Sequence, residues 1–161
     1  MEICVGASKL TKRKILSSSL IVVFCLLSTG SVAHPDAKGV VKERMVTMKA
    51  LASSMKALNQ VKSGKMPITA SSKISEKIIE LSKLIPKQFP AGTYSFPSKA
   101  SPKIDSKRAR FERMSANLRE AASTIPKIAQ AGDLEKFTSF FRDLGKTCSA
   151  CHKAFRVKRQ R

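Results

Sequence analysis

The stretch TCSACHKAFR, residues 147–156, decides both the fold and the chemistry that we predict for this chain. It places Cys148, Cys151 and His152 in the spacing Cys-x-x-Cys-His, which is typical of covalent haem attachment. Residues three and four apart share one face of a helix, so both thiols and the imidazole point the same way. Such a face offers two thiols to the vinyl groups of one haem and a nitrogen ligand to its iron. We therefore expect one haem c, attached through Cys148 and Cys151, with His152 as an axial ligand of the iron.

Two other readings of the same motif are weaker. A redox-active Cys-x-x-Cys pair normally lies near a βαβ pattern, and the sequence has none. A zinc site needs further ligands, and the chain offers only His34, Cys4 and Cys25 besides the motif.

The first 33 residues have the pattern of a secretory signal peptide. A basic segment containing Lys9 and Arg13 precedes an apolar run at residues 15–27 and the small-residue site Ser31-Val32-Ala33. Cleavage there leaves one domain at residues 34–161, and an uncleaved membrane anchor is the alternative. Because haem c is attached on the far side of the membrane, we expect a periplasmic protein. His34 would be its first residue, and we assign it no role.

The chain is strongly basic, with 31 Lys and Arg against 11 Asp and Glu. Without residues 1–33 the net charge is +17, because that segment holds four basic residues and one acidic residue. Export and haem argue against nucleic-acid binding. A basic surface suits redox partner proteins with acidic docking surfaces, or an anionic membrane surface. A homodimer is a further alternative for the partner of this chain.

The apolar spacing predicts helices and no strands. The first runs over residues 38–62, with Asp36 as N-cap, and the second starts at Ser71 or Ser72 and stops at Pro86. The apolar face expected for the second helix consists of Ile74, Ile78, Leu81 and Ile85. A proline-rich loop at residues 86–101 follows, which we expect to pack on the bundle through Phe89, Tyr94 and Phe96.

Two further helices complete the fold. Ser101 and Pro102 open the third, and Pro126 should interrupt it. Gly132 ends that segment and Asp133 caps the fourth helix. The fourth helix is expected to present one stripe of residues, namely Leu134, Phe137, Phe141, Leu144, Cys148, Cys151 or His152, and Phe155. The expected fold is all-α, an antiparallel four-helix bundle with a long loop between its second and third helices.

This layout resembles the cytochrome c′ family, the class II c-type cytochromes, over residues 36–157. The resemblance is carried by the haem motif near the C-terminus, by Arg44-x-x-x-Met48 on the first helix, and by the long loop around LIPKQFP at 84–90. That loop is similar to the connection in the family's low-spin, methionine-ligated branch. Asp105 departs from the branch, which often has an aromatic residue there.

The second axial position of the iron decides between two functions. The resemblance places Met48 there, and a thioether ligand favours low-spin iron and electron transfer. Methionine is also a common filler of apolar cores, and Met45 is a neighbour that could ligate instead. If Met48 only packs, the iron is five-coordinate and the protein is a gas-binding cytochrome c′ for nitric oxide or carbon monoxide.

Two arginines belong to the expected haem environment. Arg44 lies one turn before Met48 and could pair with a haem propionate. Arg156 lies one turn after His152, where a cation would weaken electron donation from the imidazole to iron. We favour a non-enzymatic electron carrier, because a peroxidase would need a second histidine in the bundle as a distal acid–base group.

Overall fold

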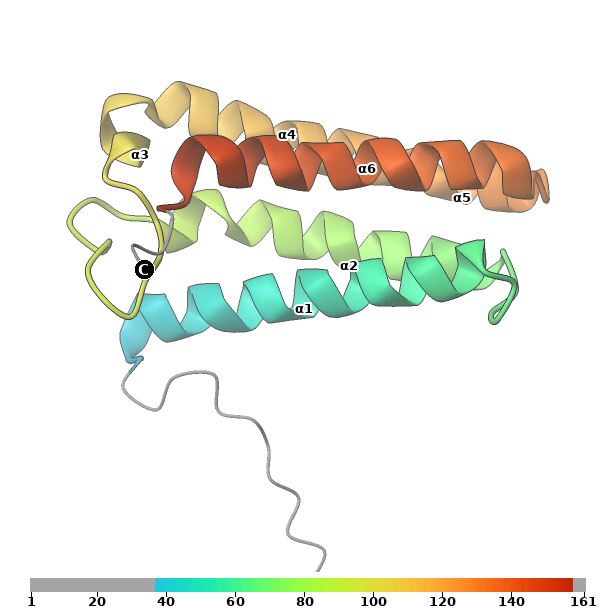
Figure 1. Cartoon of the computed structure of the whole chain (residues 1–161), viewed down its shortest axis with the longest axis horizontal. Helices are drawn as coiled ribbons and strands as arrows, with labels where there is room; N and C mark the ends of the chain where they lie inside the picture. The colour runs from blue at the N-terminus through green and yellow to red at the C-terminus, as the bar shows by residue number, and fades with distance from the viewer. Residues whose placement is uncertain (1–36, 158–161) are drawn as a thin grey trace, which may run out of the picture. The chain divides into compact units, whose positions relative to one another are not determined.

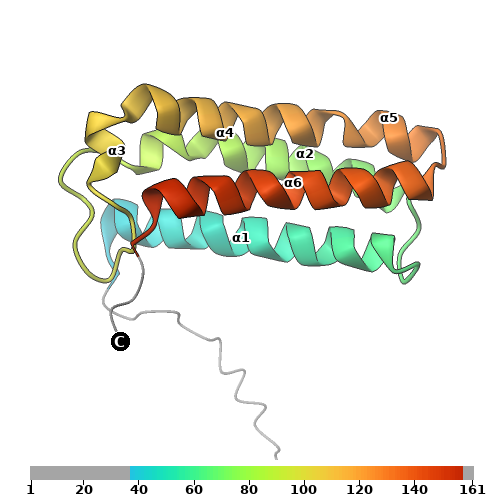
Figure 2. The same cartoon turned by 45° about the horizontal axis from the view of Figure 1, so that its top comes forward.

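The computed structural model describes residues 37–157, which form an antiparallel bundle of four helical rods (Figures 1 and 2). Two rods are the single helices α1 (Gly39–Lys62) and α2 (Ala70–Leu84), and the last is α6 (Leu134–Phe155). The third rod is built from three pieces, α3 (Lys103–Ser106), α4 (Arg108–Ser123) and α5 (Ile125–Gln130). Within residues 37–157 there is no strand, which confirms the predicted all-α bundle.

The predicted signal peptide and the proposed cap Asp36 lie outside the described residues. Among the helices of residues 37–157, none combines the length and the apolar character that crossing a membrane would require.

The helix ends follow local chemistry in some places and not in others. Asp133 caps α6 as predicted, because its carboxylate accepts a hydrogen bond of 2.8 Å from the backbone N–H of Lys136. Gly132 separates α5 from α6 with φ +66°, a left-handed conformation that glycine adopts without strain. By contrast, α1 begins at Gly39 with no side-chain cap.

The third rod breaks twice. Pro126 lies in the first turn of α5, after α4 ends at Ser123, so the predicted interruption is confirmed. A second break at Lys107, whose φ is −127°, was not predicted from the sequence. The α3 piece therefore turns away from α4 at the end of the bundle where the long loop arrives (Figure 1).

The buried face of α2 differs from the one expected. Its most buried positions include three serines at 0% exposure, and the predicted Ile74 and Leu81 are only half-buried. Each serine hydroxyl donates to a carbonyl three residues earlier in the chain, at 2.6–2.7 Å, so none needs an outside partner; the residues are Ser71, Ser75 and Ser82. Small side chains let α2 approach its neighbours closely. The cap prediction is also wrong, because α2 begins before Ser71.

The loop after α2 packs mainly through one aromatic ring. Phe89 is 6% exposed and stacks in a tilted arrangement on Phe111 of α4, with ring centroids 4.9 Å apart. Tyr94 is half-buried, and Phe96 is 82% exposed, so the expected anchoring by Phe96 is wrong. The end of the loop instead pairs with the end of α6 through an isolated bridge between Ala100 and Arg156.

Candidate haem site

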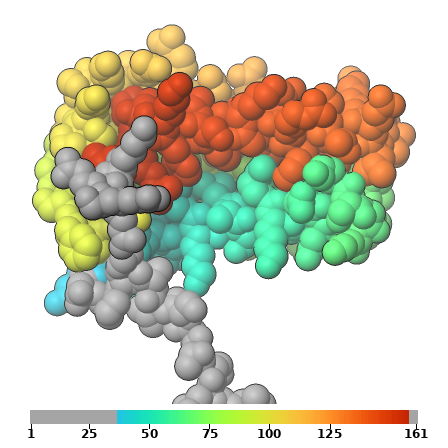
Figure 3. Space-filling model, viewed as in Figure 1, coloured from blue at the N-terminus to red at the C-terminus, as the bar shows by residue number. Residues whose placement is uncertain are grey.

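A cavity of ≈ 610 Å³ opens between α1 and α6, at the end of the bundle where α1 begins and α6 ends. Its size falls within the range of about 300–1,000 Å³ that is usual for cofactor sites. On the face shown in Figure 3, α1 and α6 lie side by side. Residues of α4 and of the long loop complete the walls, including Phe111, Met114, Leu118, Pro97 and Lys99.

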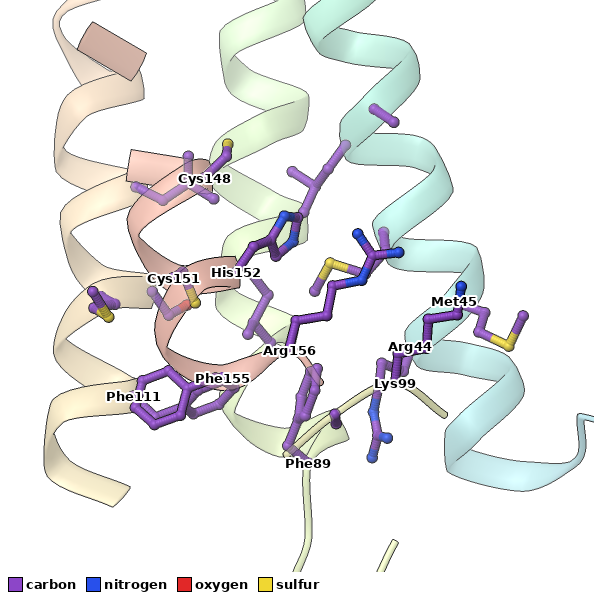
Figure 4. A pocket seen from close by; sticks show the side chains of 18 of the residues that line it. Arg44, Met45, Phe89, Lys99, Phe111, Cys148, Cys151, His152, Phe155 and Arg156 are labelled. Carbon is purple, nitrogen blue, oxygen red and sulfur yellow. The ribbon is translucent and has the colours of Figure 1, made fainter. Parts of the chain in front are cut away.

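The α6 wall holds the motif predicted from the sequence. Cys148, Cys151 and His152 all line the cavity, as their helical spacing requires (Figure 4). Both thiols are half-buried and free, and burial raises the pKa of each, so each is protonated at neutral pH. His152 is more exposed, and burial followed by the charge of Arg156 lowers its pKa. The neutral imidazole that results is the form that binds metal.

The α1 wall is apolar and contains both candidate methionines. Met48 is half-buried and packs against the hydrophobic core. Met45 also lines the cavity, but Figure 4 shows its side chain pointing away from His152. Leu51 and Met55 continue the same wall. Of the two thioethers, Met48 is therefore better placed to face the imidazole across the cavity.

Arg44 is 4% exposed at the base of the α1 wall and is bound by the loop. Its five N–H donors make five hydrogen bonds of 2.7–3.0 Å to Gln88 O, Thr93 O, Thr93 Oγ1 and Ser98 Oγ. Its guanidinium also lies 4.1 Å from the ring centroid of Phe89, and burial lowers its pKa. The pairing with a haem propionate expected from the sequence stays a prediction, and it would require Arg44 to release loop acceptors.

The rim of the cavity is basic. Lys49, Lys99 and Arg156 are exposed lining residues, and among residues 37–157 no Asp or Glu lines the cavity. Arg156 extends from α6 towards α1 (Figure 4), and its backbone N–H donates to the carbonyl of His152 at 3.0 Å. After burial, the charge of Arg156 is the second cause that lowers the pKa of His152, so it acts on the imidazole, and the expected weakening of electron donation to iron stays a prediction.

These residues fit a haem with two vinyl groups and two carboxylates. The thiols and the imidazole share one face, the walls are apolar, and the rim supplies cations without competing acids. Within residues 37–157 no three His, Cys, Asp or Glu side chains are grouped to hold a bare metal ion.

A family model described as cytochrome c′ matches residues 39–156, which is nearly the whole described bundle. The chain belongs to the cytochrome c′ family. It is therefore a c-type cytochrome, and members of this family carry covalently bound haem c.

Curated relatives of this cytochrome c′-family protein include cytochrome c′ from Pararhodospirillum photometricum, which is 32% identical over 77% of this chain and 99% of its own length. Cytochrome c-556 from Agrobacterium tumefaciens strain II Chrys is 30% identical over 75% of this chain and 99% of its own length. A similar solved structure is the nitric oxide complex of a mutant cytochrome c prime from Alcaligenes xylosoxidans. It has 30% identity and a TM-score of 0.66, and it covers 74% of this chain and 94% of its own.

The sequence alone did not reveal the role of Arg44 in holding the loop. Its partners are two backbone carbonyls and two hydroxyls that lie 44 to 54 residues away. Backbone carbonyls carry no sequence signal, so only the folded chain shows this contact. Membership of the methionine-ligated branch likewise stays a prediction. The relatives include proteins named cytochrome c′ and cytochrome c-556 at similar identity, so they do not assign the chain to one branch.

Proposed function

We propose that this protein binds a small neutral gas, nitric oxide or carbon monoxide, at a haem held by His152. The observation that carries the proposal is the apolar α1 wall opposite His152, formed by half-buried Met48, Leu51 and Met55. Among the described residues there is no second histidine to place a polar group there. The similarity to a cytochrome c prime solved with nitric oxide supports the same role.

Each lining residue has a part in this proposal. The Cys148 and Cys151 thiols would hold the haem covalently, and His152 would hold its iron from the α6 side. The rim cations Lys49, Lys99 and Arg156 would face the two carboxylates. When bound, the haem supplies an iron centre that coordinates a diatomic gas and changes between ferric and ferrous states. The apolar wall excludes water and selects a small, neutral ligand.

Electron transfer with Met48 as second axial ligand is the other candidate function. It is favoured by one observation: the Met48 side chain packs on the core in the wall opposite His152, whereas Met45 points away. The sequence by itself favours electron transfer, and the relatives solved with nitric oxide favour gas binding. Neither candidate assigns a catalysed reaction to the protein.

The visible absorption spectrum of the purified protein separates the two candidates. We expect a broad high-spin spectrum in the ferrous form that sharpens when carbon monoxide is added. A sharp low-spin spectrum that ignores the gas would overturn gas binding. Met48→Ala would then have to convert it to high spin for the electron-transfer candidate to stand. No haem spectrum at all would remove both.

We also propose an exported location and an acidic partner surface. The basic rim supports the partner, because Lys49, Lys99 and Arg156 are exposed at the cavity and have no ion pair within residues 37–157. Association that weakens steeply between about 0.05 and 0.2 M salt would support an acidic partner, and association that is insensitive to salt would contradict it.

A further inference from the structure

The long loop is hydrogen-bonded to both of the helices that form the two facing walls of the cavity. Arg44 of α1 binds it at its start, in its middle and near its end through the five hydrogen bonds described above, which reach Gln88, Thr93 and Ser98. At its end, the backbone N–H of Ser101 donates to Phe155 O at 2.8 Å, and that of Val157 donates to Lys99 O at 2.9 Å. The loop therefore connects α1 to the end of α6 directly.

These two attachments lie one helical turn from the residues that face each other across the cavity. Arg44 precedes Met48 by four residues on α1, and Phe155 follows His152 by three residues on α6. A helix rises about 1.5 Å per residue, so each attachment is only about 4–6 Å along the axis from its facing residue. A shift at either attachment moves the corresponding wall.

The cavity lies between α1 and α6 at this end of the bundle. At the opposite end α1 and α6 do touch, where Lys62 lies 5.6 Å from the ring centroid of Phe141. At the open end, hydrogen bonds connect the two helices through the loop. The loop is the element that bridges it, at the end of the bundle seen on the left of Figure 1.

We infer that residues 88–101 act as a strap that sets the distance between Met48 and His152, with Arg44 as the positioning residue. This inference rests on the proposed haem site. Arg44 touches neither facing side chain in any hydrogen bond, so it acts through the loop. Its buried guanidinium suits this role, because a planar group with five donors can hold several acceptors in one fixed arrangement.

Arg108 provides a matched control. It is a second arginine that donates to the loop, from α4 to Phe89 O at 2.6 Å, with a further ion pair to Asp105 at 3.5 Å. It holds the loop to α4 and does not link α1 to α6. Replacing Arg108 should loosen the loop locally and leave the distance across the cavity unchanged.

The test compares haem-loaded wild type, Arg44→Met, Arg44→Lys and Arg108→Met. In Arg44→Met we expect the amide protons of Ser101 and Val157 to exchange on the order of tenfold faster, as loss of a charge-assisted hydrogen bond implies. We also expect carbon monoxide to bind the ferrous protein about tenfold faster, because displacements of about 1 Å alter rates by up to about 10²-fold. Arg44→Lys should recover part of both changes, and Arg108→Met should match wild type in both.

Equal effects of Arg44→Met and Arg108→Met would overturn the strap, as would faster exchange with an unchanged gas-binding rate. If Arg44→Met does not fold, judged by circular dichroism, Thr93→Val and Ser98→Ala each remove an acceptor of Arg44 and must show the same changes more weakly. If wild type ignores carbon monoxide, the gas proposal fails, and the strap is then tested by the ferric spectrum. It stands only if Arg44→Met raises the high-spin fraction while Arg108→Met does not.

Discussion

Where α1 ends and α6 begins, side chains fill the interior of the bundle, whereas at the other end the same two helices enclose a cavity of ≈ 610 Å³. In the filled half, the large side chains Leu58, Ile125 and Phe137 are all at 0% exposure. In the open half, Met48, Cys148 and Cys151 are only half-buried. The filled half is stabilised by its own apolar burial, at about 25 cal/mol per Å². In the open half, a cofactor would bury the apolar walls, and the long loop connects the two helices there.

Loss of both thiols should have the largest effect, because it removes covalent haem attachment from the open half. The double variant Cys148→Ala/Cys151→Ala is expected to carry no covalent haem, because no other cysteine lies within residues 37–157. Haem staining after denaturing electrophoresis measures this. Ser149→Ala, on the exposed side of the same turn, is the control and should stain like wild type. Staining of the double variant would contradict the assignment of the motif.

Replacing a large side chain by a small one in the filled half should lower the free energy of unfolding and leave the haem site unchanged. Phe137→Ala is expected to lower the free energy of unfolding by about 3–5 kcal/mol, because it leaves a cavity among fully buried neighbours. Denaturant unfolding gives the value. Leu134→Ala on the same helix starts from 44% exposure and should stay within about 0.5 kcal/mol of wild type. If the two variants lose equal stability, the filled half is not held by burial.

The two methionines of the open half should differ in their effect on the rate of carbon monoxide binding. Met48→Ala should speed the binding of carbon monoxide to the ferrous protein by about tenfold, which corresponds to about 1.4 kcal/mol of barrier. The physical reason is that the Met48 side chain fills part of the wall opposite His152. Flash photolysis measures the rate. Met45→Ala should leave the rate near that of wild type, because its side chain points away from His152. A larger effect from Met45 would reverse the assignment.

The smallest effect concerns the loop contact of Tyr94. Burial, followed by its hydrogen bond to Asp105, raises the pKa of Tyr94. A group whose pKa is raised by folding stabilises the folded state below its unfolded pKa, about 10 for tyrosine, and loses that contribution as the pH rises through its folded pKa. Wild type should therefore be slightly more stable than Tyr94→Phe at pH 8, with a difference that shrinks above about pH 10. Unfolding curves over that range test this, and a constant difference would exclude it.

The filled half and the motif were largely readable from the sequence. Phe137, Leu144 and Phe155 are buried as their spacing predicts, and the Asp133 cap is present. Leu134 was expected in the same stripe and is 44% exposed, so that part of the prediction is wrong, and Phe141 is only half-buried. Helical periodicity and capping are local properties, so they are visible in a single chain. The grouping of Cys148, Cys151 and His152 follows from the same local geometry.

The open half was less predictable, because its order comes from contacts between distant backbone groups. The break at Lys107 and the loop acceptors of Arg44 leave no pattern in residue types. Arg44 was noticed for its spacing from Met48, and its partner was expected to be the haem. The exposed Phe96 shows the opposite error, in which an aromatic residue was expected to pack because of its type alone.

The buried serines of α2 have a consequence for how this protein tolerates mutation. Ser71, Ser75 and Ser82 look polar and replaceable, and loss of a hydroxyl that donates only to a carbonyl three residues earlier should change little. A larger side chain there has no room, and overpacking typically costs about 1–3 kcal/mol. In a survey of all substitutions, alanine at these positions should leave the free energy of unfolding nearly unchanged, and leucine should lower it. The buried serines of α2 are thus the positions at which added side-chain volume should destabilise the bundle most.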